Sequence, residues 1–344
     1  MILKRKVIVR TLIGLAIVYW LHRKLNFESD AYYPDQKLGN FIHSRFPLPQ
    51  AVLPSVKIVH FMNKNHLLFP EYRPYLASWR RVYPNYDFYF WTDADIDRLL
   101  ASRYPMFKSF YDERLGHPLE RSDFARVLVL HAFGGWYADL DAGSQLNAEN
   151  LTKRHSLIVP LEPFIHAMVA FKRRRLVNNA IMYSIPGHPF WMFLACRIID
   201  LVSELPQVPR NKAEAVETTG PLVMTLAMEQ FAAANAATCG DLDKGLGGSY
   251  GCPYVPWPRR FLPLFDNTSN FVAGWARIMC YTVLYVPGII DECQRMRAFD
   301  FVNVLPADAY TYHAFLHRTG AKGDQVNVSD WGLNIRFNPM NYLT

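Results

Sequence analysis

The sequence is poor in cysteine, and none of its cysteines stand at the C-x-x-C spacing that is typical of zinc sites. This absence argues against a structural zinc site. The cysteines are Cys196, Cys239, Cys252, Cys280 and Cys293, and an odd number cannot pair completely within the chain. Cys239 and Cys252 flank a glycine-rich loop, so they form a candidate disulfide if the compartment is oxidising; five buried thiols are the alternative.

The sequence also lacks helix-turn-helix, zinc-finger and single-strand-binding signatures, which argues against a nucleic-acid-binding protein. The formal net charge of +7 favours an anionic partner, such as a nucleotide sugar or phospholipid head groups. Apolar residues make up 51% of the chain and aromatic residues 15%, which excludes a disordered chain. The 344 residues suffice for one large or two modest domains with a real core.

The apolar run near the N-terminus, Val7–Leu21, has only 15 residues even when Arg10 is tolerated, whereas a membrane span needs roughly 17–25. Basic residues precede it, Tyr19 and Trp20 end it, and no small-x-small cleavage pattern follows. We therefore predict an uncleaved signal anchor over residues 1–24, with a cleaved signal peptide or a peripheral helix as alternatives. The proline-containing residues 25–51 are interpreted as a stem or linker.

The chain is organised around residues 121–141. Apolar side chains recur at helical spacing in Leu119–Phe133, which predicts an amphipathic helix. Gly134-Gly135 ends the helix with a sharp turn, and the aromatic residues that follow favour a strand ending in Asp139-Leu140-Asp141. Within the helix, Asp123 and Arg126 are three residues apart and are expected to pair.

Alternation in a strand would point the Asp139 and Asp141 carboxylates to the same side. Two such carboxylates repel each other unless a cation lies between them, and Mn²⁺ or Mg²⁺ suits oxygen ligands better than zinc. A cation held there would activate a diphosphate leaving group. The alternative without a metal is an acidic loop at the end of a strand.

The ordered combination of helix, Gly-Gly, aromatic strand and D-x-D resembles the core of glycosyltransferase family 32, which includes fungal Golgi α-mannosyltransferases and mannosylinositol phosphorylceramide synthases. The resemblance covers residues 52–225 well and the tail weakly. It implies an α/β glycosyltransferase A fold, with a mostly parallel, Rossmann-like sheet flanked by helices, in residues 52–344. The family commonly has Thr after the second Asp, where this chain has Ala142.

The resemblance extends to further site residues. It implies that His60, in the strand Val56–Phe61, and Asp93, after Trp-Thr, lie at the donor site. It implies that Arg121 and Asp123 meet the sugar or ribose, and that Gly220 in Thr-Gly-Pro lines the site. The alternatives are a core histidine at position 60, a helix N-cap at 93, and a purely structural Gly220.

His313 lies in a late Tyr-x-x-His that resembles a family motif, and it is the candidate third metal ligand beside Asp139 and Asp141. The family usually continues with Gly-Ser-Trp, which is missing here. His317 is a possible substitute if the two histidines share a helical face.

Three further segments carry expectations. Residues 156–171 hold two apolar runs, both interpreted as strands. The basic run Lys172–Arg175 suggests a solvated face or an anchor for an acidic head group. Residues 271–290 could be a membrane contact, a buried helix, or a helix followed by a strand.

Together these patterns predict a type II, metal-dependent, retaining α-glycosyltransferase of the Golgi or ER membrane with its catalytic domain in the lumen. Asp139, Asp141 and Asp123 are its catalytic candidates. GDP-mannose is the preferred donor and a glycan or glycolipid the acceptor, while UDP-galactose or UDP-glucose remains an alternative donor. Two hypotheses from different protein classes stay open, namely a haloacid-dehalogenase-type phosphohydrolase and a non-catalytic sugar-binding relative.

Overall fold

The computed structural model describes residues 36–239, 250–266, 270–282, 288–316 and 323–343. The signal anchor expected in residues 1–24 lies outside these ranges, as does His317. Among the helices that the structure describes, none combines the length and the apolar character that crossing a bilayer requires.

A seven-stranded sheet forms the centre of the molecule, in the order β11-β3-β1-β4-β7-β6-β8. Neighbouring strands run parallel except at β7, which is antiparallel to both β4 and β6. The predicted mixed α/β class with a mostly parallel sheet is therefore confirmed. The strands are β1 (Ile58–Met62), β3 (Asp87–Trp91), β4 (Gly135–Ala138), β6 (Leu157–Ile158), β7 (Ile181–Ser184), β8 (Pro253–Tyr254) and β11 (Arg336–Phe337).

Two short antiparallel pairs stand outside this sheet. The pair of β5 (Ala142–Ser144) with β9 (Thr311–His313) matters for the site, because it joins the segment after D-x-D to the tail of the chain. The other pair is β2 (Leu67–Leu68) with β10 (Val326–Asn327).

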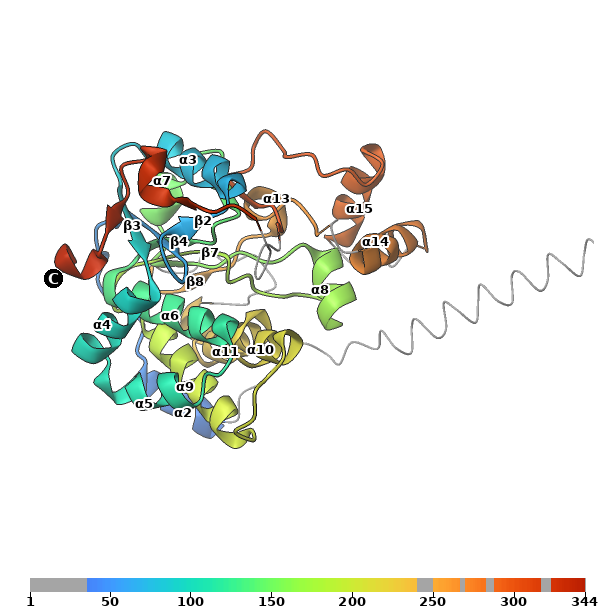
Figure 1. Cartoon of the computed structure of the whole chain (residues 1–344). Coiled ribbons are helices and arrows are strands. Elements are labelled where there is room, and N and C mark those ends of the chain that lie inside the picture. Colours follow the sequence, from blue (N-terminus) through green and yellow to red (C-terminus); the bar gives the residue numbers. More distant parts are fainter. Residues whose placement is uncertain (1–35, 240–249, 267–269, 283–287, 317–322, 344) are drawn as a thin grey trace, which may run out of the picture.

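Helices cover both faces of the sheet (Figure 1). The buried side chains form two hydrophobic clusters, one on each face, because strands such as β4 are apolar on both sides. Helices α4 (Asp93–Arg103), α6 (Pro118–Phe133), α9 (Pro189–Glu204) and α11 (Pro221–Ala234) contribute to the first cluster. Helices α3 (Arg73–Val82), α7 (Glu149–Thr152) and α13 (Pro258–Phe261) contribute to the second.

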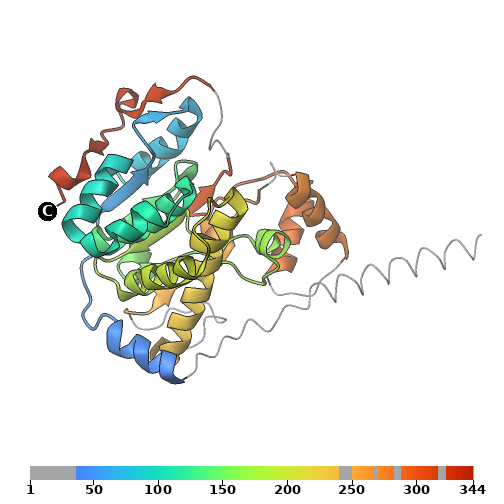
Figure 2. The same ribbon diagram turned by 60° about the horizontal axis from the view of Figure 1, so that its bottom comes forward.

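The helices not yet named complete the fold. They are α2 (Gln36–Arg45), α5 (Pro105–Glu113), α8 (Phe164–Phe171), α10 (Lys212–Thr219), α12 (Ala236–Cys239), α14 (Asn270–Thr282) and α15 (Ile289–Ala298). Figure 2 shows α2, in blue, at one end of the molecule and α14 with α15, in orange, at its side.

The turn from α6 into β4 requires glycine at both positions. Gly134 and Gly135 have φ of 63° and 86°, a region that favours glycine. A Cβ on Gly134 would lie 2.6 Å from the Pro186 nitrogen, and one on Gly135 would lie 2.7 Å from the Ile58 carbonyl oxygen. The predicted helix, glycine turn and strand are confirmed, and the strand ends at Ala138, one residue before D-x-D.

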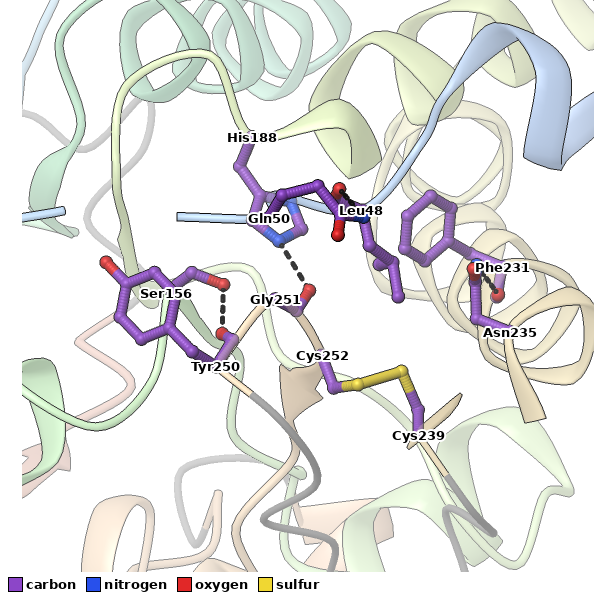
Figure 3. The surroundings of a disulfide bond; sticks show 10 residues. All are labelled: Leu48, Gln50, Ser156, His188, Phe231, Asn235, Cys239, Tyr250, Gly251 and Cys252. Atoms are coloured by element: carbon purple, nitrogen blue, oxygen red, sulfur yellow. Dashed lines mark hydrogen bonds between the residues drawn. A yellow bond between two sulfur atoms is a disulfide. The ribbon is translucent and has the colours of Figure 1, made fainter. Parts of the chain in front are cut away.

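Part of the range predicted as a stem is folded. Helix α2 places Ile42 completely inside the core. Farther along, Gly251 approaches Pro49 so closely that an added Cβ would lie 2.7 Å from the Pro49 carbonyl oxygen. Figure 3 shows Leu48 and Gln50 in this packed region. The isolated prolines suggested a linker, but long-range packing decides otherwise.

The candidate disulfide Cys239–Cys252 is present and joins the end of α12 to the start of β8 (Figure 3). A second disulfide, Cys280–Cys293, joins α14 to α15 and was not predicted. Cys196 is a free thiol. The alternative of five buried thiols is therefore wrong.

Two further expectations need correction. The second apolar run of residues 156–171 forms helix α8 instead of a strand, since only Leu157–Ile158 pairs with the sheet. The described part of residues 271–290 belongs to two helices, α14 and the start of α15, instead of a helix followed by a strand, with residues 283–287 outside the described ranges. The membrane-contact alternative for this segment stays a prediction.

Candidate functional site

Asp139, Asp141 and His313 lie together at one edge of the central sheet. Asp139 follows β4, Asp141 precedes β5, and His313 ends β9, which pairs with β5 so that Ala142 faces His313. One possible ligand atom from each of the three side chains lies within 4.8 Å of the other two. The three residues chosen from the sequence as metal ligands thus form one cluster.

The D-x-D motif lies in a turn, which corrects the prediction that it belongs to a strand. The Ala142 amide donates to the Asp139 carbonyl at 2.9 Å, closing the turn, and the Asp139 amide donates to the Ala180 carbonyl at 2.8 Å. The turn still brings both carboxylates close to the imidazole of His313. The two carboxylates therefore lie together as expected, but because of a turn conformation of the backbone and not because of alternation along a strand.

Asp141 and His313 form an ion pair, with 3.1 Å between the His313 Nε2 and the Asp141 Oδ1. Burial alone would raise the pKa of Asp141, but His313 and the Leu316 amide, which donates to Oδ2 at 2.9 Å, lower it to about 2. Burial opposes protonation of His313, yet Asp141, Asp139 and Glu162 raise its pKa to about 9. The electrostatic potential at the His313 imidazole is therefore strongly negative.

The cluster fits a divalent cation. It offers two carboxylates and an imidazole, and the buried Nδ1 atom of His313 has no hydrogen-bond partner among the described residues. Asp141 is held ionised, and the ligand types suit Mn²⁺ or Mg²⁺.

Arg126 links the cluster to helix α6. Its guanidinium lies 3.1 Å from Asp139 Oδ1 and 3.2 Å from Asp123 Oδ1, and it donates to the Asn179 carbonyl at 2.7 Å. Its side chain is only 7% exposed, so the two carboxylates rely on it for compensation of their charge. The expected pairing of Asp123 with Arg126 is confirmed, and the bridge to Asp139 is an addition that helical spacing could not show.

Asp123 is fixed from three sides. Besides Arg126, the Asn179 amide donates to Oδ1 at 2.9 Å and the Thr219 hydroxyl to Oδ2 at 2.9 Å. Burial raises its pKa to about 6 even though Arg126 opposes this. Gly220 follows Thr219 between α10 and α11; a Cβ there would lie 2.6 Å from the Val216 carbonyl oxygen, so glycine is required by close packing. This supports the structural interpretation of Gly220.

His60 does not offer an atom to a donor. It is fully buried, Trp91 Nε1 donates to its Nδ1 at 3.0 Å, and its Nε2 donates to the Gly134 carbonyl at 2.9 Å. Burial lowers its pKa to about 4. These contacts support the core-histidine alternative for His60.

The buried, neutral His60 makes stability depend on pH. Below pH 6.5 the unfolded chain binds a proton at this residue and the folded chain does not, so stability falls as the pH drops from 6.5 towards 4. At pH 5 we expect His60 to account for a loss of about 2 kcal/mol relative to pH 7.5. In urea unfolding of His60→Gln, the difference in the free energy of unfolding between pH 7.5 and pH 5 should be smaller than in the wild type by about 2 kcal/mol. The exposed-residue control His43→Gln should keep it, and equal pH dependence in all three proteins would refute the assignment.

Arg121 and Asp93 lie near each other but are not among the ligands of the cluster. The Arg121 guanidinium donates to the carbonyls of Leu115 at 2.8 Å and Asp112 at 3.3 Å. Asp93 begins α4 and is exposed to solvent. Partial desolvation of its carboxyl by the neighbouring chain raises its pKa, and the charges of Lys64 and Arg121 oppose this shift. Thr92, not Asp93, is the N-cap, with Asp95 completing the capping box. A donor role for Arg121 and Asp93 stays a prediction.

Sequence reasoning missed several residues around the cluster. The Tyr137 hydroxyl donates to Asp139 Oδ1 at 2.8 Å, and alternation from Asp139 could have indicated it. Glu162 accepts from Asn178 and lies 3.2 Å from His166 Nδ1. Its negative charge contributes to the raised pKa of His313. Nothing in the local pattern marked Glu162, because the segment around it was recognised only as apolar runs.

The sequence comparisons agree with this geometry. Residues 70–157 match a family model described as "Glycosyltransferase sugar-binding region containing DXD motif". The inositol phosphoceramide mannosyltransferase 3 of Schizosaccharomyces pombe is 26% identical over 59% of this chain and 51% of its own. The mannosyl phosphorylinositol ceramide synthase SUR1 of Saccharomyces cerevisiae is 25% identical over 67% of this chain and 56% of its own. The chain spans about half the length of these curated relatives.

A solved structure titled "PaToxG Glycosyltransferase" matches with a TM-score of 0.39 and 15% identity, over 57% of this chain and 75% of that one, which is too weak a likeness for an inference. The family model covers both aspartates of the cluster. The resemblance predicted from the sequence is confirmed: residues 70–157 of this chain are similar to the sugar-binding region of the glycosyltransferases with a DXD motif.

Proposed function

We propose that the protein is a metal-dependent, retaining mannosyltransferase that moves mannose from GDP-mannose to a glycolipid acceptor of the inositol phosphoceramide type. The cluster of Asp139, Asp141 and His313 carries this proposal, and its two aspartates lie within the matched residues 70–157. The similar yeast proteins are an inositol phosphoceramide mannosyltransferase and a mannosyl phosphorylinositol ceramide synthase, which supports mannose as the sugar and inositol phosphoceramide as the acceptor class. A Golgi membrane location and a glycosyltransferase A fold are parts of the same proposal.

The site residues have three different roles in this proposal. Asp139, Asp141 and His313 would hold Mn²⁺ or Mg²⁺, which supplies neutralisation of the charge that develops on the departing diphosphate. Arg126 and Tyr137 fix the Asp139 carboxylate, since both donate to its Oδ1 atom. Asp123, held by Asn179 and Thr219, is proposed to orient the sugar.

In the transfer step the acceptor hydroxyl oxygen forms a bond to the anomeric carbon while the bond from that carbon to the diphosphate oxygen breaks. The hydroxyl proton passes to the departing diphosphate, and attack on the face that the diphosphate leaves retains the configuration. The donor would lie along the carboxyl ends of β1, β3 and β4, which are parallel and end at one edge of the sheet.

Isothermal titration tests the donor assignment. With Mn²⁺ present we expect the protein to bind GDP much more tightly than UDP. We expect EDTA to abolish the binding, because the cation that the cluster would hold would neutralise the charge of the diphosphate. Binding of UDP alone would keep the site and replace the donor by a UDP-sugar. Failure to bind either nucleotide with Mn²⁺ would contradict the transferase proposal.

A further inference from the structure

Helices α14 and α15 form a projection at one end of the molecule. Figures 1 and 2 both show them beside α8 and outside the layers that cover the sheet, and both helices contact α8. The disulfide Cys280–Cys293 joins them, so they form one connected unit.

This projection lies at the same edge of the sheet as the metal-ligand cluster. Strand β7 is antiparallel to both β4 and β6, so β4 and β6 run in the same direction. Asp139 follows the carboxyl end of β4, and α8, which supports the projection, follows the carboxyl end of β6. A surface beyond α8 therefore lies on the side from which a substrate reaches the cluster.

Large apolar side chains are exposed on the projection. Tyr281 is 64% exposed, Phe299 50% and Val302 62%. The ring of Tyr281 lies 5.9 Å from that of the buried Phe301, and Phe299 and Val302 flank Phe301 in the chain. We call Tyr281, Phe299 and Val302 the α14–α15 patch.

The backbone after α15 holds this arrangement in place. Asp300 and Phe301 both have left-handed φ, 49° and 59°, and the Phe301 amide donates to the Met296 carbonyl at 2.7 Å. The Val302 amide donates to the Phe299 carbonyl at 2.9 Å. This bonded turn directs Phe301 inward and keeps Phe299 and Val302 outside, so their exposure is a property of the fold.

Cationic side chains border the patch. The Arg277 guanidinium lies 5.1 Å from the centre of the Phe301 ring, and Arg297 Nε donates to the Cys293 carbonyl at 3.3 Å. Neither arginine has a carboxylate partner in the part of the chain that the structure describes. Two exposed acids lie on the same segment: Asp300 follows α15, and Asp291, in the first turn of α15, pairs with Arg295 at 3.7 Å.

We propose that the α14–α15 patch inserts into the interfacial layer of an anionic lipid bilayer, with Arg277 and Arg297 at the head groups. Exposed aromatic and aliphatic side chains next to arginines are what such an interface favours. The choice of a bilayer over a protein partner rests in part on the proposed function, because a glycolipid acceptor must be reached at a membrane. Insertion at this edge would bring the cluster to the acceptor's head group.

Site-specific fluorescence tests the proposal in the full chain, whatever its N-terminal segment does. Tyr281→Cys and Val302→Cys, each in a Cys196→Ser background, are labelled with an environment-sensitive dye and reconstituted in vesicles of phosphatidylcholine with phosphatidylinositol. Spin-labelled lipid should quench both dyes at least about twofold, because such surfaces enter the interface by about 5–10 Å. Met106→Cys, on the exposed surface of α5, is the matched control and should not be quenched.

Unquenched dyes at positions 281 and 302, on protein that floats with the vesicles, would overturn the proposal. A shift of dye emission without quenching by lipid would also overturn it, since protein and not lipid would then cover the patch. This readout needs no enzymatic activity, so it separates failure of the patch from failure of the proposed function.

A second variant checks the consequence for transfer. Tyr281→Ser/Val302→Ser should lower transfer to a vesicle-embedded acceptor about tenfold and leave transfer to the same acceptor in detergent near the wild-type rate. Equal loss in both assays would mean that the substitutions damage the fold, and equal rates in both would overturn the membrane role.

Discussion

Replacing Asp141 with asparagine is expected to lower the rate of sugar transfer by about 10²–10³-fold, the range for removing one group that stabilises developing charge. Asparagine keeps the shape of the side chain and can still accept from the Leu316 amide, but it removes the negative charge that pairs with His313 and would hold the cation. The measurement is the initial rate of transfer from the nucleotide sugar, at saturating acceptor and over a range of Mn²⁺ concentrations.

EDTA provides the sharper comparison. If Asp141 acts through the cation, EDTA should slow the wild-type protein to about the rate of Asp141→Asn and should slow the variant little further, because one interaction cannot be lost twice. Asp330→Asn, at an exposed carboxylate, is the matched control and should keep both the rate and the response to EDTA. A normal rate in Asp141→Asn would remove the D-x-D turn from the mechanism.

Replacing Arg126 with alanine is expected to lower the free energy of unfolding by about 3–5 kcal/mol, because the change leaves two carboxylates without their cation. The Arg126 side chain is 7% exposed and the Asp123 side chain 8%, so water cannot take over this role. Arg126→Lys should restore part of the stability, since lysine keeps the charge but cannot reach Asp123, Asp139 and the Asn179 carbonyl with a planar fork. Urea unfolding measures all three proteins.

Arg197 supplies the matched control. It pairs with Asp200 at the same spacing of three residues, at 3.3 Å, but its side chain is 39% exposed. Arg197→Ala should therefore change the free energy of unfolding by less than about 1 kcal/mol. If the two alanine variants unfolded alike, the burial of the Arg126 pairs would not be what stabilises this part of the fold.

Measurements of nucleotide binding and of stability distinguish two roles of Arg126, namely stabilising the fold and positioning the Asp139 carboxylate. Arg126→Lys should fold well enough for titration with GDP and Mn²⁺, and we expect weaker binding there, because Asp139 would no longer be held by the guanidinium. Unchanged binding in a destabilised Arg126→Lys would show that Arg126 serves the fold and not the positioning of the ligand.

The local pattern of the sequence determined much of the fold that supports the site. Helical spacing, Gly134-Gly135 and the aromatic residues after them predicted α6, its turn and β4, and the structure confirms all three. Such elements depend on side-chain periodicity and on backbone conformations that glycine allows, and both can be read from neighbouring residues. The glycine-rich loop between Cys239 and Cys252 likewise pointed to the disulfide that joins them.

The same local pattern misled where packing decides the outcome. The apolar run that forms α8 was expected as a strand, because a short run without clear periodicity suits either a buried helix or a strand. His60 was expected at the donor site, but its contacts with Trp91 and Gly134 support a core position. Residues 36–45 were expected in a stem, but Ile42 is buried in the core.

By itself, the sequence determined that two carboxylates stand next to a glycine-bounded strand and that a late histidine was a candidate to join them. Only the tertiary structure decided that His313 reaches Asp141 across 172 residues and that Arg126 spans from α6 to Asp139. It also decided that D-x-D is a turn. The physical reason is that pairing of β5 with β9 and burial of Arg126 are long-range interactions, which no periodicity within one segment encodes.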